Sequence, residues 1–160
     1  MNAPQTPLSA AAAAAIPAGF KPLKFMGFMA VNGPLYGYLH AEDGLPVMGF
    51  RVEERHCNPM MVCHGGMLMT FADMLLGFTC SVAAGGRKFM PTVNLAGDYV
   101  GPAKLGSWVE GRGRLLRQTR NLGFADCLIT ADGAPCLRAS GIMKIPAQES
   151  READVLSLFG

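Results

Sequence analysis

Net charge is nearly absent from this chain. Its 14 lysine and arginine residues almost balance its 12 aspartate and glutamate residues, so the formal charge over 160 residues is +2. A charge this small gives no reason to expect nucleic acid as the main partner. Charged residues are also few, at 16%, whereas apolar residues make up 50%. This composition is typical of a globular domain with a substantial core.

A disulfide framework and a secretory signal are also missing. The five cysteines are an odd number, and they lie within apolar or strand-like runs. This pattern favours reduced, buried thiols in a cytoplasmic protein. The N-terminal alanine run has no positive charge before it and ends at Pro17, which does not fit a signal peptide. We therefore expect a cytoplasmic protein with a disordered or fraying tail at residues 1–19.

The rest of the chain contains no internal repeat, and a single domain is predicted over residues 20–146. We expect a short amphipathic helix at residues 20–31, and either a C-terminal tail or a short docking helix at residues 147–160. Segments with strand-like composition alternate with turns rich in glycine, proline and asparagine. The predicted strands are residues 34–43, 46–54, 91–101, 107–118, 122–132 and 135–145.

The longest apolar run is GMLMTFADMLLGFTCSVAA, residues 66–84. Its nineteen residues would be enough to cross a bilayer. Against a membrane span, Asp73 lies near the middle of the run, and no cluster of cations flanks it. A helix that is apolar on every face can also be the buried centre of a soluble domain.

The strands support this second interpretation. Gly111 and Gly113 alternate with arginines in one predicted strand, and Gly141 lies on the apolar face of the last one. Small residues in mid-strand let another backbone come close. We therefore predict an α+β fold in which a curved antiparallel sheet wraps around one central apolar helix.

Upstream of this helix, the stretch HCNPMMVCHGGM at residues 56–67 concentrates possible ligands and nucleophiles. His56–Cys57 and Cys63–His64 are adjacent pairs, whereas structural zinc sites space their paired ligands a few residues apart. Cys63 and His64 are also neighbours in sequence, unlike the distant Cys and His of known cysteine hydrolases. We therefore predict no metal site and no cofactor, and we expect both cysteines to be small buried hydrophobic residues.

A third interpretation of this stretch uses neither cysteine. The sequence His64-Gly65-Gly66 leads into the helix, and the first N–H groups of a helix lie unpaired at the positive end of its dipole. Such groups suit an anion, or a carbonyl oxygen that becomes an oxyanion. Asp73 is the one charge in the helix, and a buried carboxylate needs a partner or a task. It is either a structural aspartate or a general base or nucleophile.

Several of these features occur together in one known family. The combination resembles the hotdog-fold acyl-CoA thioesterases of the phenylacetate-degradation type, over about residues 30–146. The resemblance implies the hotdog fold, and it implies an enzyme that hydrolyses an acyl-CoA thioester to a carboxylic acid and free coenzyme A. It is carried by Asn58, His64-Gly65-Gly66, Asp73, Thr92 and YVGPAKLG at residues 99–106.

The resemblance also implies a role for each matching residue. Asp73 would activate water or attack the thioester, and Gly65 would supply the backbone N–H that polarises the thioester carbonyl. His64 and Asn58 would orient this loop and the substrate. Thr92 would help to hold the attacking water.

Further residues are expected to contact the substrate. Many members of this family have glycine near the position of Met61, so we expect Met61 to change the conformation of the loop or to narrow the acyl pocket. Gly66 continues the backbone site at the start of the helix. Arg117, Arg120 and Asn121 lie near a turn and are candidates for binding the phosphates of coenzyme A, because arginine pairs well with phosphate.

The spacing of the two central residues predicts an oligomer. Gly65 and Asp73 are eight residues apart, which is ~12 Å along a helix. A carbonyl held at Gly65 is hard to reach from Asp73 of the same chain, whereas two antiparallel helices would bring one chain's aspartate to the other chain's glycine. We therefore predict a homodimer or homotetramer with the site shared between subunits.

The sequence leaves the acyl group and two other functions open. A medium-chain or aryl acyl group would suit the Met-rich and Phe-rich helix, although these side chains also fit a plain core. A non-catalytic acyl-CoA binding protein would not need Asp73, and a hotdog dehydratase or hydratase fits the spacing less well. The Met and Phe side chains of this helix are Met67, Met69, Phe71, Met74 and Phe78.

Neither nucleic acid nor a membrane is expected as a partner.

Overall fold

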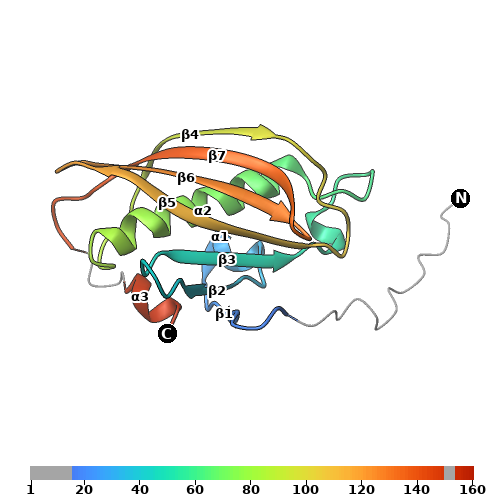
Figure 1. Ribbon diagram of the computed structural model, residues 1–160, viewed down its shortest axis with the longest axis horizontal. Helices are drawn as coiled ribbons and strands as arrows, with labels where there is room; N and C mark the ends of the chain where they lie inside the picture. Colours follow the sequence, from blue (N-terminus) through green and yellow to red (C-terminus); the bar gives the residue numbers. More distant parts are fainter. Residues whose placement is uncertain (1–15, 150–153) are drawn as a thin grey trace, which may run out of the picture.

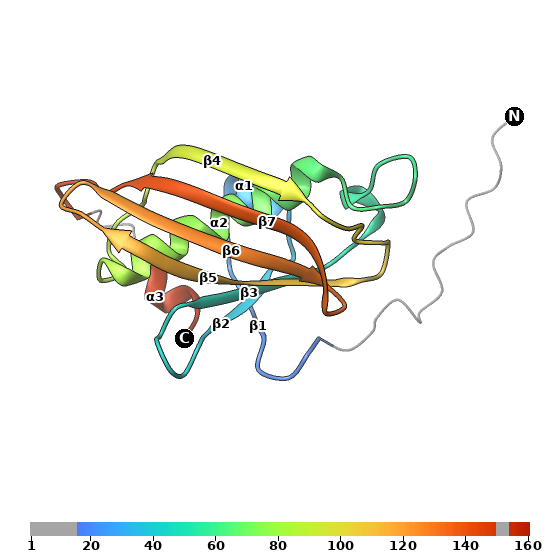
Figure 2. The same ribbon diagram turned by 45° about the horizontal axis from the view of Figure 1, so that its top comes forward.

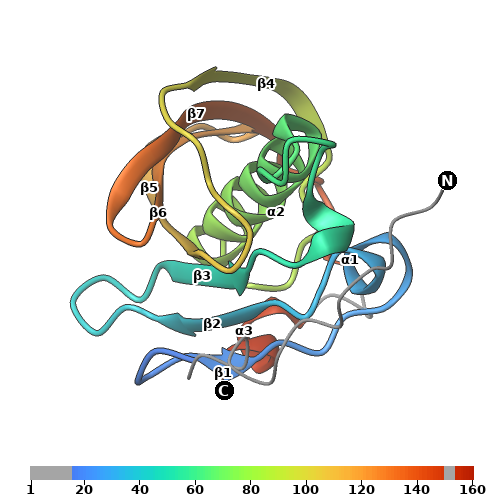
Figure 3. The same cartoon turned by 90° about the vertical axis from the view of Figure 1, so that its right-hand side faces the viewer.

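Residues 16–149 and 154–160 are described by the computed structural model, and within them seven strands form one antiparallel sheet. The strand order is β1-β2-β3-β5-β6-β7-β4. The sheet curves around helix α2, Gly65–Ala83, which Figures 1 and 3 show from the side and from one end. The hotdog fold predicted from the sequence is confirmed.

The longer strands lie close to their predicted positions because their alternating pattern is strong. The shorter helices are α1 Gly27–Val31, the 3-10 helix η2 Glu54–His56 and α3 Val155–Leu158. The strands are β1 Lys21–Pro22, β2 Tyr36–Leu39, β3 Pro46–Arg51, β4 Thr92–Tyr99, β5 Trp108–Gln118, β6 Leu122–Ala131 and β7 Ala134–Lys144.

The helix predicted at residues 20–31 is largely wrong. Lys21–Pro22 pairs with β2 as an edge strand, and only Gly27–Val31 is helical. Proline has no N–H to donate inside a helix. Gly27 has a φ of +60°, in the left-handed region, which interrupts a right-handed helix. The apolar pattern of this segment therefore reflects packing by short irregular pieces.

Glycines in the sheet set its distance from α2. A Cβ added at Gly113 would lie 1.7 Å from Thr79 Oγ1, and one at Gly123 would lie 2.8 Å from Cys80 Sγ. Neither position has room for a side chain while α2 stays where it is. This is the close approach predicted from the small residues in mid-strand.

The burial of α2 is that of a core helix. It is long and apolar enough to cross a membrane by length and composition, but 61% of its most apolar window is buried inside the domain. Phe71, Leu75 and Leu76 are 0% exposed. Burial of this kind is expected of the central helix of a domain.

Strand β4 lies at the outer edge of the sheet (Figure 2), and its pairing with β7 contains a bulge. The register shifts by one residue just after Thr92, which makes Val93 the extra residue. Thr92 lies opposite Met143 and Tyr99 lies opposite Leu137. Both partners on β7 are 0% exposed. Because paired residues share a face of the sheet, Thr92 and Tyr99 are both on the inner face.

The two ends of the chain differ in what the structure describes. Residues 1–15 and 150–153 lie outside the described residues, so the tail predicted at residues 1–19 stays a prediction. The last described residues form α3, which packs on the domain through Val155, 1% exposed, and Phe159, 5% exposed. The Val155 N–H donates a hydrogen bond of 2.9 Å to the Gly86 carbonyl.

Candidate active site

The loop before α2 folds back on itself as a narrow antiparallel turn. Cys57 and Cys63 lie opposite each other in an isolated bridge. Beside this bridge, the His64 N–H donates to the His56 carbonyl at 2.7 Å. These contacts fix the register of the turn, and they deliver His64 to the N-cap position of α2.

Asn58 shapes the tip of this turn with its side chain. Its Oδ1 accepts the Met60 N–H at 2.9 Å and the Val62 N–H at 3.4 Å. Met61 has a φ of +58°, a left-handed conformation that glycine adopts most easily. A glycine, which the resemblance described above leads us to expect near this position, would adopt this conformation with less strain. Met61 is 43% exposed and is not among the side chains that line the cavity around Asp73.

The start of α2 presents one unused backbone donor. His64 Nδ1 accepts the Gly66 N–H at 2.9 Å, so that N–H is already paired. The Gly65 N–H makes no hydrogen bond within residues 16–149 and 154–160. Of the two glycines singled out from the sequence, Gly65 is therefore the one whose N–H remains available, at the positive end of the helix dipole.

Tyr99 is a residue of this site that the sequence reasoning missed. Its hydroxyl donates a hydrogen bond of 2.9 Å to the Gly65 carbonyl. Its ring would lie 3.1 Å from a Cβ at Gly65, so any side chain there would press on the tyrosine. The one available signal was its place at the start of YVGPAKLG. Tyr99 holds the first turn of α2 from the edge strand β4.

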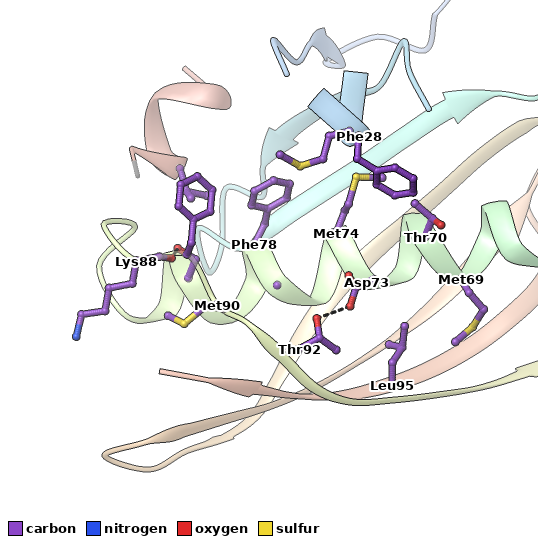
Figure 4. A pocket seen from close by; sticks show the side chains of 15 residues that line it. Phe28, Met69, Thr70, Asp73, Met74, Phe78, Lys88, Met90, Thr92 and Leu95 are labelled. Carbon is purple, nitrogen blue, oxygen red and sulfur yellow. Dashed lines mark hydrogen bonds between the residues drawn. The ribbon is translucent and has the colours of Figure 1, made fainter. Parts of the chain in front are cut away.

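Asp73 on α2 lies beside Thr92, the first residue of β4 (Figure 4). The Thr92 hydroxyl donates to Asp73 Oδ1 at 2.7 Å, which the dashed line marks. Asp73 is half-buried. Its carboxylate is therefore paired with a neutral donor, and within the described residues its second oxygen has no hydrogen-bond partner.

A cavity of about 420 Å³ surrounds this pair. Its walls are mostly apolar and come from α2, α1, α3, β4 and the segment that precedes β4 (Figure 4). Met69, Met74 and Phe78 line it, whereas Phe71 and Met67 belong to the buried core. The other lining residues are Phe28, Met29, Thr70, Gly77, Ser81, Lys88, Phe89, Met90, Leu95 and Val155.

The three residues suggested for the phosphates of coenzyme A lie elsewhere. Arg117, Arg120 and Asn121 are exposed at the turn between β5 and β6. None of them lines the cavity around Asp73. Their role stays a prediction.

The cysteines have the character of buried apolar residues. Cys63, Cys80, Cys127 and Cys136 are free and buried, and Cys57 is half-buried. Burial raises the pKa of Cys63 and of Cys127 to about 12. A thiol with this pKa is neutral at pH 7 and is a poor nucleophile.

His56 is likewise part of the structure of the loop. It is 4% exposed, its ring packs edge-on against Phe50, and its Nδ1 accepts the Glu53 N–H at 3.0 Å. Burial, followed by the nearby Arg55 charge, lowers its pKa below the usual value. Among the residues that the structure describes, no group of three or more His, Cys, Asp or Glu side chains is placed to hold a metal ion.

Comparisons with known proteins point in one direction. A family model described as "Thioesterase superfamily" matches residues 60–136. A Pseudomonas aeruginosa protein named "Putative esterase PA0474" is 31% identical over 132 residues, which is 82% of this chain and 98% of that protein. Human "Acyl-coenzyme A thioesterase 13" is 28% identical over 101 residues, which is 63% of this chain and 71% of the relative.

Solved structures agree with these matches. Zebrafish thioesterase superfamily member 2 is 27% identical and has a TM-score of 0.68, covering 76% of this chain and 88% of that one. A mutant of the phenylacetic acid degradation protein PaaI from Thermus thermophilus is 23% identical with a TM-score of 0.63, covering 73% of this chain and 96% of that one.

Proposed function

The chain belongs to the thioesterase superfamily, and on that premise we propose that it hydrolyses a medium-chain or aryl acyl-CoA to a carboxylic acid and free coenzyme A. Thioester hydrolysis is the activity that its family indicates. The observation that carries the proposal is the Asp73–Thr92 pair, which lies within an apolar cavity of about 420 Å³. A carboxylate in apolar surroundings is a recurrent general base or nucleophile.

Asp73 is the group that acts on the thioester. Thr92 holds one carboxylate oxygen at 2.7 Å, which leaves the other oxygen to take a proton from water. The resulting hydroxide attacks the carbonyl carbon, the C–S bond breaks, and the sulfur leaves with the proton as the free thiol. In the alternative route the same oxygen attacks the carbonyl carbon, the C–S bond breaks, and the coenzyme A thiolate leaves an anhydride behind. Water then hydrolyses the anhydride to the carboxylic acid, and the proton left on Asp73 passes to the thiolate. Thr92 positions the carboxylate in both routes.

The developing oxyanion is assigned to the Gly65 N–H. This donor is unpaired among the described residues, and the dipole of α2 favours negative charge there. His64 caps the helix through Gly66, and Asn58 holds the preceding turn. Both therefore position the donor without contacting the reacting atoms.

The composite site requires a second copy of the chain. Gly65 and Asp73 stand at separate places along α2, ~12 Å apart by helix geometry. The outer strand β4 pairs only with β7 within the described residues, and it carries exposed apolar side chains at Val93, 59% exposed, and Tyr99, 54% exposed. An unpaired apolar edge favours symmetric pairing with another copy. We assign a homodimer as the smallest active unit.

The rival functions fit this site less well. A dehydratase or hydratase would need a histidine beside the helix carboxylate, but His64 caps α2 and His56 is buried against Phe50. A non-catalytic binding protein would not need the Asp73–Thr92 pair.

The free, buried thiols support a cytoplasmic location.

A hydrolysis panel tests the proposal. Purified protein would be given acyl-CoA substrates from acetyl to palmitoyl, with benzoyl and phenylacetyl members, and release of free thiol would be followed with a thiol reagent. We expect turnover that is highest for medium-chain or aryl members. Absence of thiol release from every member, with a correctly folded preparation, would exclude acyl-CoA hydrolysis.

A further inference from the structure

The cavity runs along α2 on both sides of Asp73, from Met69 to Ser81, and its longer part lies between Asp73 and the end of the helix. Asp73, Gly77 and Ser81 follow one another at intervals of four residues, so they share one face of α2. A Cβ added at Gly77 would meet no atom within 4 Å. Gly77 is therefore the open floor of the cavity between Asp73 and Ser81.

Three of the side chains that line the cavity toward the end of α2 are buried, and we refer to them as the end wall. They are Phe78, 5% exposed, Ser81, 2% exposed, and Val155, 1% exposed. The Ser81 hydroxyl is already used, since it donates to the Lys88 carbonyl. The end wall therefore presents an apolar surface to the cavity.

The charge of Lys88 does not enter this end. Its Nζ donates to the Pro146 carbonyl at 3.0 Å, and Figure 4 shows the side chain leading away from the cavity. Among the residues that the structure describes, an acyl group that ended in a carboxylate would thus find no cation there. The chemistry of the end wall fits a terminal methyl group.

Helix α3 holds Val155 firmly in place. The ring of Phe159 packs edge-on against Phe78 at 6.0 Å, and Leu156 packs on Gly86, where an added Cβ would lie 2.6 Å from its Cγ. Asp154 caps the short helix by accepting the Ser157 N–H at 3.2 Å. Val155 comes from residues beyond the segment 60–136 that the family model matches.

The helix gives a length for the acyl chain. Eight residues from Asp73 to Ser81 correspond to ~12 Å along α2. An extended backbone advances about 3.4 Å for every three bonds, so the same distance takes about ten bonds of an alkyl chain. A carbonyl carbon beside Asp73 would therefore place the terminal methyl of an acyl chain of about ten carbons at the end wall.

We propose that the cavity is a binding site for straight, saturated acyl chains of about ten carbons, and that Val155 of α3 sets this limit. The inference rests on the proposed acyl-CoA thioesterase function and narrows its substrate class. An aryl acyl group would leave the far half of the cavity empty. One methylene more or less in an apolar pocket changes kcat/KM by roughly 10- to 200-fold.

The test uses kcat/KM for the even-numbered acyl-CoA series from two to sixteen carbons. We expect the wild type to favour about ten carbons. Val155→Ala should raise the ratio of fourteen-carbon to ten-carbon turnover at least about tenfold, and Val155→Phe should lower the ratio of ten-carbon to six-carbon turnover by a similar factor. Val109→Ala is the matched control, because Val109 is 0% exposed but does not line the cavity.

Gly77→Leu gives a second variant that should fold well. Leucine favours a helix more than glycine does, and the space above Gly77 is open. We expect this variant to lower the ratio of ten-carbon to four-carbon turnover at least about tenfold. An unchanged chain-length profile in the Val155 and Gly77 variants would overturn the proposal that the end wall limits the length of the acyl chain. A wild type that is inactive on this series but hydrolyses benzoyl-CoA or phenylacetyl-CoA would overturn this inference alone, whereas inactivity on the aryl members as well would overturn the proposed function.

Discussion

Asp73→Asn separates the chemistry at α2 from the packing around it. Asparagine has nearly the same shape, and its Oδ1 can still accept the hydrogen bond that Thr92 donates at 2.7 Å. The negative charge is lost, and with it the ability to take a proton from water or to attack the thioester. General acid–base catalysis contributes roughly 10²- to 10⁴-fold. We therefore expect kcat to fall at least about a hundredfold.

Stability should change little in the same variant. A hydrogen bond to a charged acceptor becomes one to a neutral acceptor, which costs about 1 kcal/mol. Removing a half-buried charge acts in the opposite direction. The net change should stay within about 1 kcal/mol, which for a chain of this size shifts Tm by about 2–4 °C.

The assay measures kcat and Tm on one preparation, with Asp126→Asn as the matched control. Asp126 binds Arg114 through both carboxylate oxygens and does not line the cavity around Asp73. This control should keep wild-type turnover. If Asp73→Asn turned over normally per folded molecule, or lost activity only in step with early melting, Asp73 would be structural and the catalytic assignment would be wrong.

Three further predictions concern the assembly, the first turn of α2 and the thiols. Mixed dimers of Asp73→Asn with Gly65→Leu subunits should regain activity, because one of their two sites is intact; no recovery after verified subunit exchange would refute a shared site. Tyr99→Phe should lower kcat about two- to tenfold with little change in KM, since one neutral hydrogen bond to Gly65 is lost. Cys63, whose pKa is raised to about 12 by burial, should resist iodoacetamide at pH 8 until the protein is unfolded, as mass spectrometry would record; rapid labelling of the native protein would contradict this.

The sheet and its helix were predictable because their patterns are long. In β7, buried Leu137, Ala139 and Met143 alternate with exposed Arg138 and Lys144, which is the period of a half-buried strand. The apolar run of α2 fits only a central position once Asp73 argues against lipid. The segment at residues 20–31 failed because it is short, and there Pro22 and Gly27 decide the backbone while apolar side chains merely pack.

The site was predictable only in part, for a different physical reason. His64, Gly65 and Asp73 lie on one helix, so their relation follows from sequence spacing. Tyr99 and Val155 reach the site from other elements, and no local pattern reveals which residues meet across the fold. Contacts of this kind depend on strand register and on docking of the chain end, which the tertiary structure alone settles.

The bulge in β4 has a consequence for insertions and deletions. Thr92 and Tyr99 are separated by an odd number of positions, so in a regular strand they would point to opposite sides. Because Val93 is an extra residue, the side chains of Thr92 and Tyr99 lie on the same face of the sheet. One strand can therefore contact α2 both at Asp73 and at Gly65. Deleting Val93 would leave Thr92 and Tyr99 six positions apart, an even number that keeps both on the inner face of a regular strand. A residue inserted into the regular part of the strand, between Asn94 and Tyr99, would instead turn Thr92 away from Asp73 while Tyr99 stayed at Gly65.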